Sequence, residues 1–340
     1  MRESDATKLS AMVKILLTHT PFMRRSYYGE RALAGLRALG PVTLHESEAA
    51  LDADTLAAAA RGHQVVVSDR NTPGFGKVFD SCPDLVAFVR CAVDIRNVEL
   101  ARASANGVLV TRASAGFVPA VAELVLGFLV DLARGVSGAV ADYRAGRVPV
   151  AAMGRQLSGS ALGVIGYGAI GRRVAQLGVA LGMRVLVTDP HSMASDAGIE
   201  QVSLHELLAQ ADYVVCLAVA TGETENLMNE QAFSHMKPGA FFINVSRGNL
   251  VDEAALARAL DSGWIAAAAL DVGRAPDQMP TPSLAIRPDV IATPHVGGLT
   301  PEAIEHQSLE TVAQVAEILR GRAPKGAVNA AEAARLERLA

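Results

Sequence analysis

The segment Ala161-Leu-Gly-Val-Ile-Gly-Tyr-Gly-Ala-Ile-Gly171 joins an apolar run to a glycine-rich turn, and Arg172–Leu181 continues with helical periodicity. This order predicts a strand, a tight turn and a helix. Gly166 allows the turn, Gly168 lets the backbone approach a pyrophosphate, and Gly171 allows the helix to pack closely on the strand. The segment therefore predicts a dinucleotide-binding loop.

The residues that follow this loop indicate which dinucleotide is bound. Ala169 and Ile170 open the helix, whose N–H groups and positive dipole end favour phosphates. A second predicted strand ends in Asp189, 18 residues after Gly171. A carboxylate there accepts hydrogen bonds from the adenosine ribose hydroxyls and repels a 2′-phosphate. We therefore expect NAD as the cofactor; the alternative is a glycine-rich turn and a surface Asp without a ligand.

Short apolar runs alternate with helical stretches along most of the chain. The first series of predicted strands comprises Val13–Leu17, Val42–His45, Gln64–Ser68, Leu85–Cys91 and Val108–Thr111, with helices at Glu30–Leu39, Leu51–Arg61 and Val98–Ala105. The second series of strands comprises Ala161–Gly166, Arg184–Asp189, Tyr213–Val219, Ala240–Val245, Ala266–Asp271 and Val290–Thr293, followed by a helix at Pro301–Arg320. Strands separated by helices are typical of parallel sheets with crossover connections, so we expect an α/β fold.

Composition excludes several classes of partner. The chain has 340 residues and a formal net charge of −4, a length that predicts two domains. Acidic and basic residues are interspersed without a basic stripe, so we expect no nucleic-acid partner. No apolar run reaches about 18 residues, and Met1–Met12 lacks the features of a signal peptide, so we expect no membrane partner.

The cysteines indicate the redox environment. Cys82, Cys91 and Cys216 are odd in number and show neither a CxxC pattern nor a metal-ligand spacing. We therefore expect reduced thiols, a cytoplasmic location and no metal.

Two further segments carry expectations about packing. Pro119–Arg134 predicts a helix too apolar for a free surface, which we expect to pack between domains or between subunits. The tail from Gly321 is rich in Ala and charged residues, and we expect it to be peripheral.

Three later motifs add a family resemblance. They are Asn244-Val-Ser-Arg-Gly-Asn-Leu-Val-Asp-Glu253, Ala269-Leu-Asp-Val272 and Thr293-Pro-His-Val-Gly-Gly298. With the glycine loop, their order and spacing resemble the D-isomer-specific 2-hydroxyacid dehydrogenase family. The resemblance implies two Rossmann-like domains with parallel sheets, in which the nucleotide domain is inserted into a flavodoxin-like substrate domain. It places the substrate domain at 1–112 plus 302–340 and the NAD-binding domain at 113–301, and it implies a homodimer formed through the latter.

The resemblance also implies roles for single residues. Arg247 resembles the catalytic arginine, whose planar, permanently charged fork suits a 2-keto acid; the alternative is an Arg tied to a backbone carbonyl in a turn. His295 resembles the proton donor and acceptor for the C2 oxygen of the substrate, although a lone His is often structural. The expected nicotinamide contacts are Asp271, Ser246, Gly297 and Gly298. Thr221 and Thr224 match the family threonines that follow the fourth strand of the nucleotide domain, where contacts to the adenine are expected. A capping role is the alternative for Asp271.

One departure from the family pattern concerns the partner of the histidine. The family places a glutamate five residues after the Asp of its Leu-Asp-Val motif, and that carboxylate orients the histidine and raises its pKa. This chain has Pro276 at that position. Asp277 follows and could substitute for the glutamate in a rearranged loop, or it could be a solvated loop residue; both interpretations stay open.

A second departure lies in the predicted substrate domain. The family shows Arg-x-Gly-Val-Gly-x-Asp-Asn, whose glycine-flanked N–H groups bind the substrate carboxylate, but this chain reads Arg90-Cys-Ala-Val-Asp-Ile-Arg-Asn97. Val93 and Asp94 would then lie near the substrate. Asp94 could partner His295, read a polar or cationic substrate group, or cap the following helix.

The motifs together predict an NAD-dependent oxidoreductase that interconverts a small D-2-hydroxy acid and its 2-keto acid. Arg247 would anchor the substrate and His295 would act as acid and base, while closure of the cleft excludes water. The alternatives are an NAD-binding sensor or corepressor-like protein, and an enzyme with a larger substrate that Arg70 could contact. Retention of both Arg247 and His295 argues against a dead site.

Overall fold

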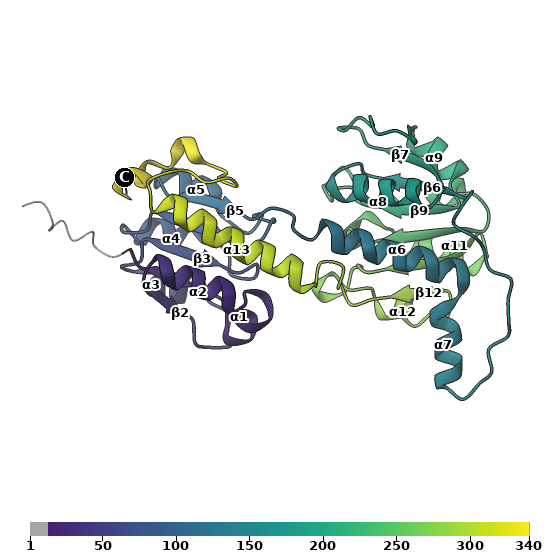
Figure 1. The fold of residues 1–340 in the computed structure, drawn as a ribbon, viewed down its shortest axis with the longest axis horizontal. Coiled ribbons are helices and arrows are strands. Elements are labelled where there is room, and N and C mark those ends of the chain that lie inside the picture. Colours follow the sequence, from purple (N-terminus) through teal and green to yellow (C-terminus); the bar gives the residue numbers. More distant parts are fainter. Residues whose placement is uncertain (1–12, 340) are drawn as a thin grey trace, which may run out of the picture. The chain divides into compact units, whose positions relative to one another are not determined.

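The computed structural model describes residues 13–339, so the polar segment Met1–Met12 lies outside the described residues. The described chain divides into two compact units. The first contains the residues up to Gly116 and those from Pro301 onward, and the second is Phe117–Thr300 (Figure 1). Each unit contains one sheet whose strands all pair in parallel, which confirms the predicted α/β fold.

The first unit contains a five-stranded sheet in the order β2-β1-β3-β4-β5. This is the flavodoxin-like order, in which the chain reverses direction across the sheet between β1 and β3. The strands are β1 (Ile15–Leu17), β2 (Val42–Leu44), β3 (Val65–Ser68), β4 (Ala87–Arg90) and β5 (Leu109–Arg112). The helices are α1 (Pro21–Tyr27), α2 (Glu30–Leu39), α3 (Ala53–Ala60), α4 (Gly76–Ser81), α5 (Leu100–Ala105) and α13 (Pro301–Ile318).

Helices cover both faces of this first sheet. On one face α2 and α13 pack against alternate residues of the strands, such as Ile15 and Val65, which are fully buried. On the other face α3, α4 and α5 pack against the intervening residues, such as Leu16 and Val66. Burial on both faces explains why the strands read as continuous apolar runs rather than alternating ones.

The tail from Gly321 is not peripheral, contrary to the expectation from its composition. Ala327 forms an antiparallel bridge with Thr111 of β5. The buried Asn329 side chain accepts a hydrogen bond from the N–H of Val110 and donates one to the carbonyl of Val108. Leu336, in the short 3-10 helix at Ala334–Leu339, joins the same apolar cluster as α2 and α13. The tail thus extends the core of the first unit.

The second unit contains a seven-stranded sheet in the order β12-β11-β10-β9-β6-β7-β8. Counted from β6, this is the Rossmann order with one further strand, and the direction reverses between β6 and β9. The strands are β6 (Ala161–Ile165), β7 (Arg184–Thr188), β8 (Ile199–Gln201), β9 (Tyr213–Cys216), β10 (Ala240–Asn244), β11 (Ile265–Leu270) and β12 (Val290–Ala292). The helices are α6 (Val118–Arg134), α7 (Val136–Arg144), α8 (Ala169–Ala180), α9 (Leu204–Gln210), α10 (Glu230–His235), α11 (Glu253–Asp261) and α12 (Pro282–Ala285).

The apolar helix α6 packs on the sheet of its own unit. Its buried residues, among them Val125 and Phe128, join α8 on one face of the sheet, whereas α9, α10 and α11 cover the other. We expected α6 to pack between domains or between subunits. Its buried side instead packs against the sheet of its own unit. Its length and apolarity fit a helix that crosses several strands of a two-sided sheet.

The chain turns sharply after α6. Gly135, in the left-handed conformation, separates α6 from α7, and α7 with the segment 145–156 forms an arm that extends from the second unit (Figure 1). No single helix within residues 13–339 is long and apolar enough to cross a bilayer. Helices α6 and α7 reach that length and apolarity only as a pair, with a bend of 71° between them.

Candidate functional site

The glycine loop lies where the second sheet reverses direction, between β6 and β9. Gly166 has a φ of 97°, which side-chain-bearing residues rarely adopt, and a Cβ there would lie 2.6 Å from the carbonyl oxygen of Leu217. A Cβ on Gly171 would lie 2.0 Å from the carbonyl oxygen of Gly166. Gly166 therefore requires glycine for the conformation of the turn, and Gly171 requires it for close packing.

Gly168 differs from these two glycines, because it faces open space. No atom of the described residues outside its immediate neighbours lies within 4 Å of the place where its Cβ would be. Gly168 is the N-cap of α8, and within residues 13–339 no side chain caps that helix end. The N–H groups of Ala169 and Ile170 are thus left for an anion, and the loop fits the pyrophosphate of a dinucleotide.

Asp189 follows β7 and braces the glycine loop from the side. Its carboxylate accepts hydrogen bonds from the N–H of Tyr167 at 2.7 Å, from that of His191 at 2.7 Å and from that of Ser192 at 3.0 Å. Partial burial opposes ionisation, but these backbone donors outweigh it, so the pKa of Asp189 lies below its ordinary value. A carboxylate has lone pairs left after three such bonds, so Asp189 can still accept from ribose hydroxyls.

Ser246 and Arg247 follow β10 and form the turn before a 3-10 helix at Gly248–Leu250. The Ser246 hydroxyl donates to the carbonyl of Ala218 at 2.7 Å, which ties the ends of β10 and β9 together. The Arg247 guanidinium donates to the carbonyl of Ser246 at 2.7 Å, and the Arg247 carbonyl accepts from Asn244. The turn thus holds the arginine backbone at the carboxyl edge of the sheet.

Asp271, directly after β11, organises the loop that carries the histidine. One carboxylate oxygen accepts from the Thr293 hydroxyl at 2.6 Å and from the Val296 N–H at 2.8 Å, and the other accepts from the Gly297 N–H at 2.9 Å. The side chain is 2% exposed. The structure therefore shows the capping contacts for Asp271. Gly298 follows in the same loop, and a Cβ there would lie 3.3 Å from Phe117.

His295 is half-buried in this loop and has a φ of 55°. Its Nδ1 lies 2.8 Å from the backbone carbonyl oxygen of Asp277, in the loop after β11. The Asp277 side chain is exposed. Of the two groups that Asp277 offers, it is therefore the carbonyl, rather than the carboxylate, that contacts the imidazole.

Thr221 and Thr224 shape the loop after β9. The N–H of Thr221 donates to the Thr224 hydroxyl at 2.8 Å, and that hydroxyl donates to the carbonyl of Val219 at 2.7 Å. Thr221 itself is exposed. These threonines therefore stabilise a turn beside the glycine loop.

Val93 and Asp94 lie in the first unit, in the loop after β4. The Asp94 carboxylate pairs with Arg96, at 2.6 Å from Nη2, and also accepts from the N–H of Arg96. Arg90, to which the sequence analysis gave no role, organises this loop. It is 2% exposed, although it carries a charge. Its guanidinium donates to the carbonyls of Asp69, Arg70, Thr72 and Asp94 and to the side chains of Ser68 and Asn97.

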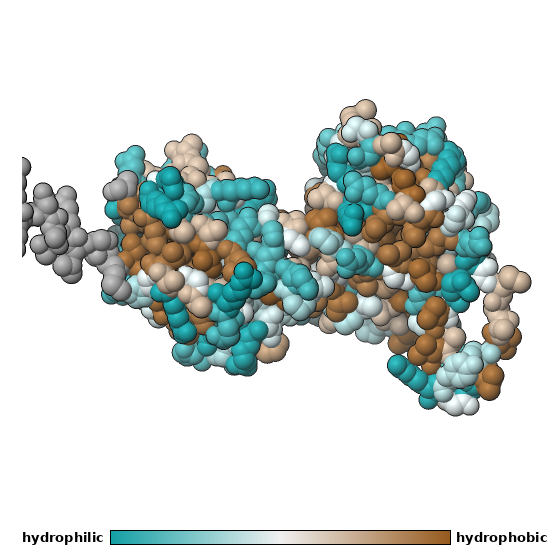
Figure 2. Space-filling view, viewed as in Figure 1, coloured by the Kyte–Doolittle hydropathy of each residue, from teal (hydrophilic) through white to brown (hydrophobic). Residues whose placement is uncertain are grey.

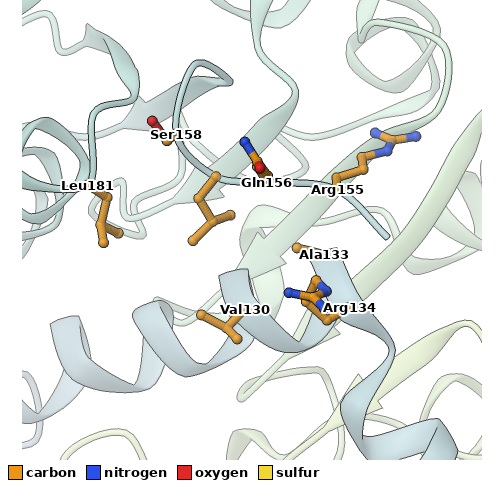
Figure 3. Close-up of a pocket in the computed structure, with 8 residues that line it drawn as sticks. Val130, Ala133, Arg134, Arg155, Gln156, Ser158 and Leu181 are labelled. Carbon is orange, nitrogen blue, oxygen red and sulfur yellow. The ribbon is translucent and has the colours of Figure 1, made fainter. Parts of the chain in front are cut away.

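A shallow hollow of about 400 Å³ lies at the opposite, amino edge of the second sheet. Figure 3 shows Val130, Ala133 and Arg134 of α6 on one side of it, with Arg155, Gln156, Ser158 and Leu181 on the other. It is separate from the glycine loop, because Ser158 precedes β6 and Gly166 follows it. Among residues 13–339, no three His, Cys, Asp or Glu side chains are placed to hold a metal ion.

Comparison with known proteins supplies the family. Residues 126–297 match the family model described as "D-isomer specific 2-hydroxyacid dehydrogenase, NAD binding domain". The chain belongs to this family. The matched residues fall within the second unit, which is therefore the NAD-binding domain.

Individual relatives agree with this membership. The chain is 38% identical over 258 residues to D-3-phosphoglycerate dehydrogenase 3, chloroplastic, of Arabidopsis thaliana, which covers 74% of this chain and 44% of that protein. It is 30% identical over 243 residues to hydroxypyruvate reductase of Thermotoga maritima, covering 70% of this chain and 79% of that protein. The chain spans about half the length of the phosphoglycerate dehydrogenases that it matches.

A solved structure from Thermus thermophilus superposes with a TM-score of 0.82 and 30% identity, over 93% of this chain and 100% of that one. The two-unit α/β architecture is therefore shared with a solved structure over 93% of this chain, and the family model identifies the second unit as the NAD-binding domain.

Proposed function

We propose that this protein is an NAD-dependent dehydrogenase that interconverts a small D-2-hydroxy acid and its 2-keto acid. Arg247 anchors the substrate carboxylate and carbonyl oxygen, and His295 exchanges a proton with the C2 oxygen. The observation that carries the proposal is the placement of three motifs on one sheet. The glycine loop, Arg247 and His295 follow β6, β10 and β12, at the edge where ligands bind in such sheets.

The cofactor and the protein divide the chemistry. NAD supplies the hydride acceptor when bound. The glycine loop and α8 orient the pyrophosphate, Asp189 binds the adenosine ribose, and Ser246, Asp271, Gly297 and Gly298 surround the nicotinamide. We assign the substrate domain to the first unit, with Val93 and Asp94 on its substrate loop.

The test is a panel of 2-keto acids with NADH and of 2-hydroxy acids with NAD, monitored at 340 nm. The names of the relatives make hydroxypyruvate and D-3-phosphoglycerate the first choices. We expect turnover with at least one acid and its loss, by about 10²-fold or more, in Arg247→Gln and His295→Gln. Tight NADH binding without oxidation across the panel would instead favour an NAD-binding sensor. This alternative is motivated by Pro276, which stands where the family has the glutamate.

We further propose a cytoplasmic homodimer. The arm formed by α7 and residues 145–156 exposes apolar side chains, with Val148 84%, Val150 91% and Met153 100% exposed. Figure 2 shows brown, hydrophobic side chains on the protruding arm. Exposed apolar residues gathered on one protruding segment are typical of a subunit contact.

The three cysteines are unpaired and buried, which fits a reducing compartment such as the cytoplasm. Light scattering of wild type and of Val148→Asp/Val150→Asp tests the dimer, since the double variant is expected to be monomeric.

A further inference from the structure

The contact between His295 and Asp277 determines which imidazole nitrogen carries the proton. A carbonyl oxygen only accepts hydrogen bonds, so the ring nitrogen 2.8 Å from it, Nδ1, must donate. In the neutral ring Nε2 is then the acceptor. This is the form that takes a proton from a substrate hydroxyl and, once protonated, returns it to a carbonyl oxygen.

The loop after β11 is shaped to present that carbonyl. Asp277 and Gln278 have φ values of 56° and 58°, in the left-handed region that residues with side chains seldom occupy. Backbone hydrogen bonds close the loop on itself: the N–H of Gly273 donates to the carbonyl of Gln278 at 2.8 Å, and that of Ala275 to the carbonyl of Met279 at 3.1 Å. Unfavourable backbone angles persist where the surroundings determine them, and they concentrate at functional sites.

The same loop is bound to the turn that carries Arg247. A Cβ on Gly248, the residue after Arg247, would lie 2.0 Å from the carbonyl oxygen of Gly273, so the two segments are in close contact. The Glu253 carboxylate accepts from the N–H of Arg274 at 3.0 Å and from the Thr281 hydroxyl at 2.9 Å, which holds both ends of the loop. One framework therefore supports Arg247 and His295.

We propose that the backbone carbonyl of Asp277, held by the left-handed turn at Asp277 and Gln278, positions His295 in place of a carboxylate. This inference rests on the proposed function, in which His295 handles the proton. Asp277 is a positioning residue, and it acts through its main chain. A carbonyl fixes the tautomer and orientation of the ring as a carboxylate does, but it brings no full negative charge to the imidazolium.

Two substitutions at Asp277 separate the carbonyl from the carboxylate. Asp277→Gly and Asp277→Val both remove the carboxylate, but glycine adopts a positive φ readily whereas β-branched valine does not. We expect kcat of the valine variant to fall about tenfold below that of the glycine variant, with KM for NADH the same in both. An equal fall in the two variants, with the same pH profile in both, would overturn the inference, because it would assign the role to the carboxylate.

A spectroscopic measurement checks the tautomer without turnover. In nitrogen-15 spectra, assigned with His295→Gln, we expect neutral His295 to be protonated at Nδ1 in the wild type and the glycine variant, and to show a mixture of tautomers in the valine variant. Protonation at Nε2 in the wild type would contradict the inference. Circular dichroism and NADH binding show that each variant is folded.

The arrangement also predicts the effect of restoring the family residue. Pro276→Glu places a carboxylate one residue before the carbonyl, and we expect the high-pH limit of 2-keto acid reduction to move upward, since a carboxylate stabilises the imidazolium. The ionisable groups on and against the segments around His295 are unchanged in this variant; they are Asp271, Asp277, Arg274, Arg247, Glu253 and Glu225. An unmoved limit here, together with a lowered limit in Asp277→Gly, would contradict the inference, because the two results would show that the Asp277 carboxylate already supports the histidine.

The outcomes distinguish this inference from the function that it deepens. If His295→Gln keeps full turnover, the proposed function fails. If His295→Gln abolishes turnover while the glycine and valine variants of Asp277 behave alike, only the role of the carbonyl fails.

Discussion

The carboxyl edges of the two sheets use their backbone groups in opposite ways. In the second unit, the loop after β6 presents N–H groups, and Gly168 leaves the space in front of them open. In the first unit, the loops after β3 and β4 present carbonyl oxygens, and the buried Arg90 guanidinium fills the space between them. The loop after β6 is thus left for an anionic ligand, whereas the space between the loops after β3 and β4 is filled by an internal cation.

The difference follows from the sign of the exposed backbone dipoles. N–H groups at a helix start attract a mobile phosphate, so they can be satisfied when a ligand binds. Converging carbonyl oxygens need a donor at all times, because burying them without one costs free energy. The second unit can therefore bind a ligand with its main chain, whereas the first holds two loops in place with a side chain.

Removal of Arg90 should have the largest effect on stability, because Arg90 holds the two loops of the first unit together. Arg90→Met keeps the apolar stem but leaves several buried acceptors without a donor, and we expect a loss of about 3–5 kcal/mol in the free energy of unfolding. Urea unfolding followed by circular dichroism measures it. The control is Arg96→Met, since Arg96 is 68% exposed and its pair with Asp94 should contribute at most about 1 kcal/mol. Equal losses in the two variants would contradict a structural role for Arg90.

Substitutions in the glycine loop separate folding from binding. Gly171→Ala forces a Cβ against the backbone of Gly166, and we expect a loss of about 3 kcal/mol in stability. Gly168→Ala meets open space, so it should fold as the wild type does but bind NADH about tenfold more weakly, because the methyl group occupies ligand space. Thermal unfolding and NADH fluorescence titration test both. Undiminished NADH affinity in Gly168→Ala would show that the pyrophosphate lies elsewhere.

His19, which interacts with Asp69 and Arg90, makes the stability of the first unit sensitive to pH. Burial lowers the pKa of His19 from 6.5 to about 4, Asp69 opposes this shift, and Arg90 and Arg24 add to it. Between these pH values His19 is protonated in the unfolded chain but neutral in the folded chain. Stability should therefore fall as the pH drops from about 6.5 to 4, by roughly 3 kcal/mol.

The variant His19→Phe isolates this effect from the carboxylates, which also titrate in acid. We expect the difference in unfolding free energy between wild type and variant to change between pH 7 and pH 4.5, in the direction that disfavours the wild type in acid. Urea midpoints at the two pH values measure it. A constant difference would contradict this prediction, because it would show that folding leaves the pKa of His19 unchanged.

Asp189 should have the smallest effect on turnover, because the change that we test there is in the choice of cofactor; serine keeps an oxygen that can accept from the N–H of Tyr167. Asp189→Ser removes the charge that repels a 2′-phosphate, and we expect the preference for NAD over NADP in kcat/KM to narrow about tenfold. Asp196→Asn is the matched control, since Asp196 accepts from the Tyr167 hydroxyl on the neighbouring loop. A wild-type preference for NADP would contradict the assignment of the ribose site.

Contiguous patterns in the sequence were sufficient to predict the parallel strands and the glycine loop. They also predicted that Asp189, Arg247 and His295 lie at strand ends. Each depends on neighbours within a few residues, such as an apolar run followed by a turn, so the chain itself carries the signal. The α/β fold and the NAD-binding domain follow from these local patterns, and the family comparison confirms both.

Tertiary structure alone decided how the site is supported. The carbonyl of Asp277 meets His295 only because Glu253 and the turn after Arg247 hold its loop, and the sequence around Pro276 indicated a missing carboxylate rather than this substitute. Arg90 reads as an ordinary charged residue, and the tail as an ordinary polar end, until their partners in distant segments are known. Most of those partners are backbone N–H and carbonyl groups, which every residue type provides. Their positions therefore leave no pattern in the sequence and become fixed only when the chain has folded.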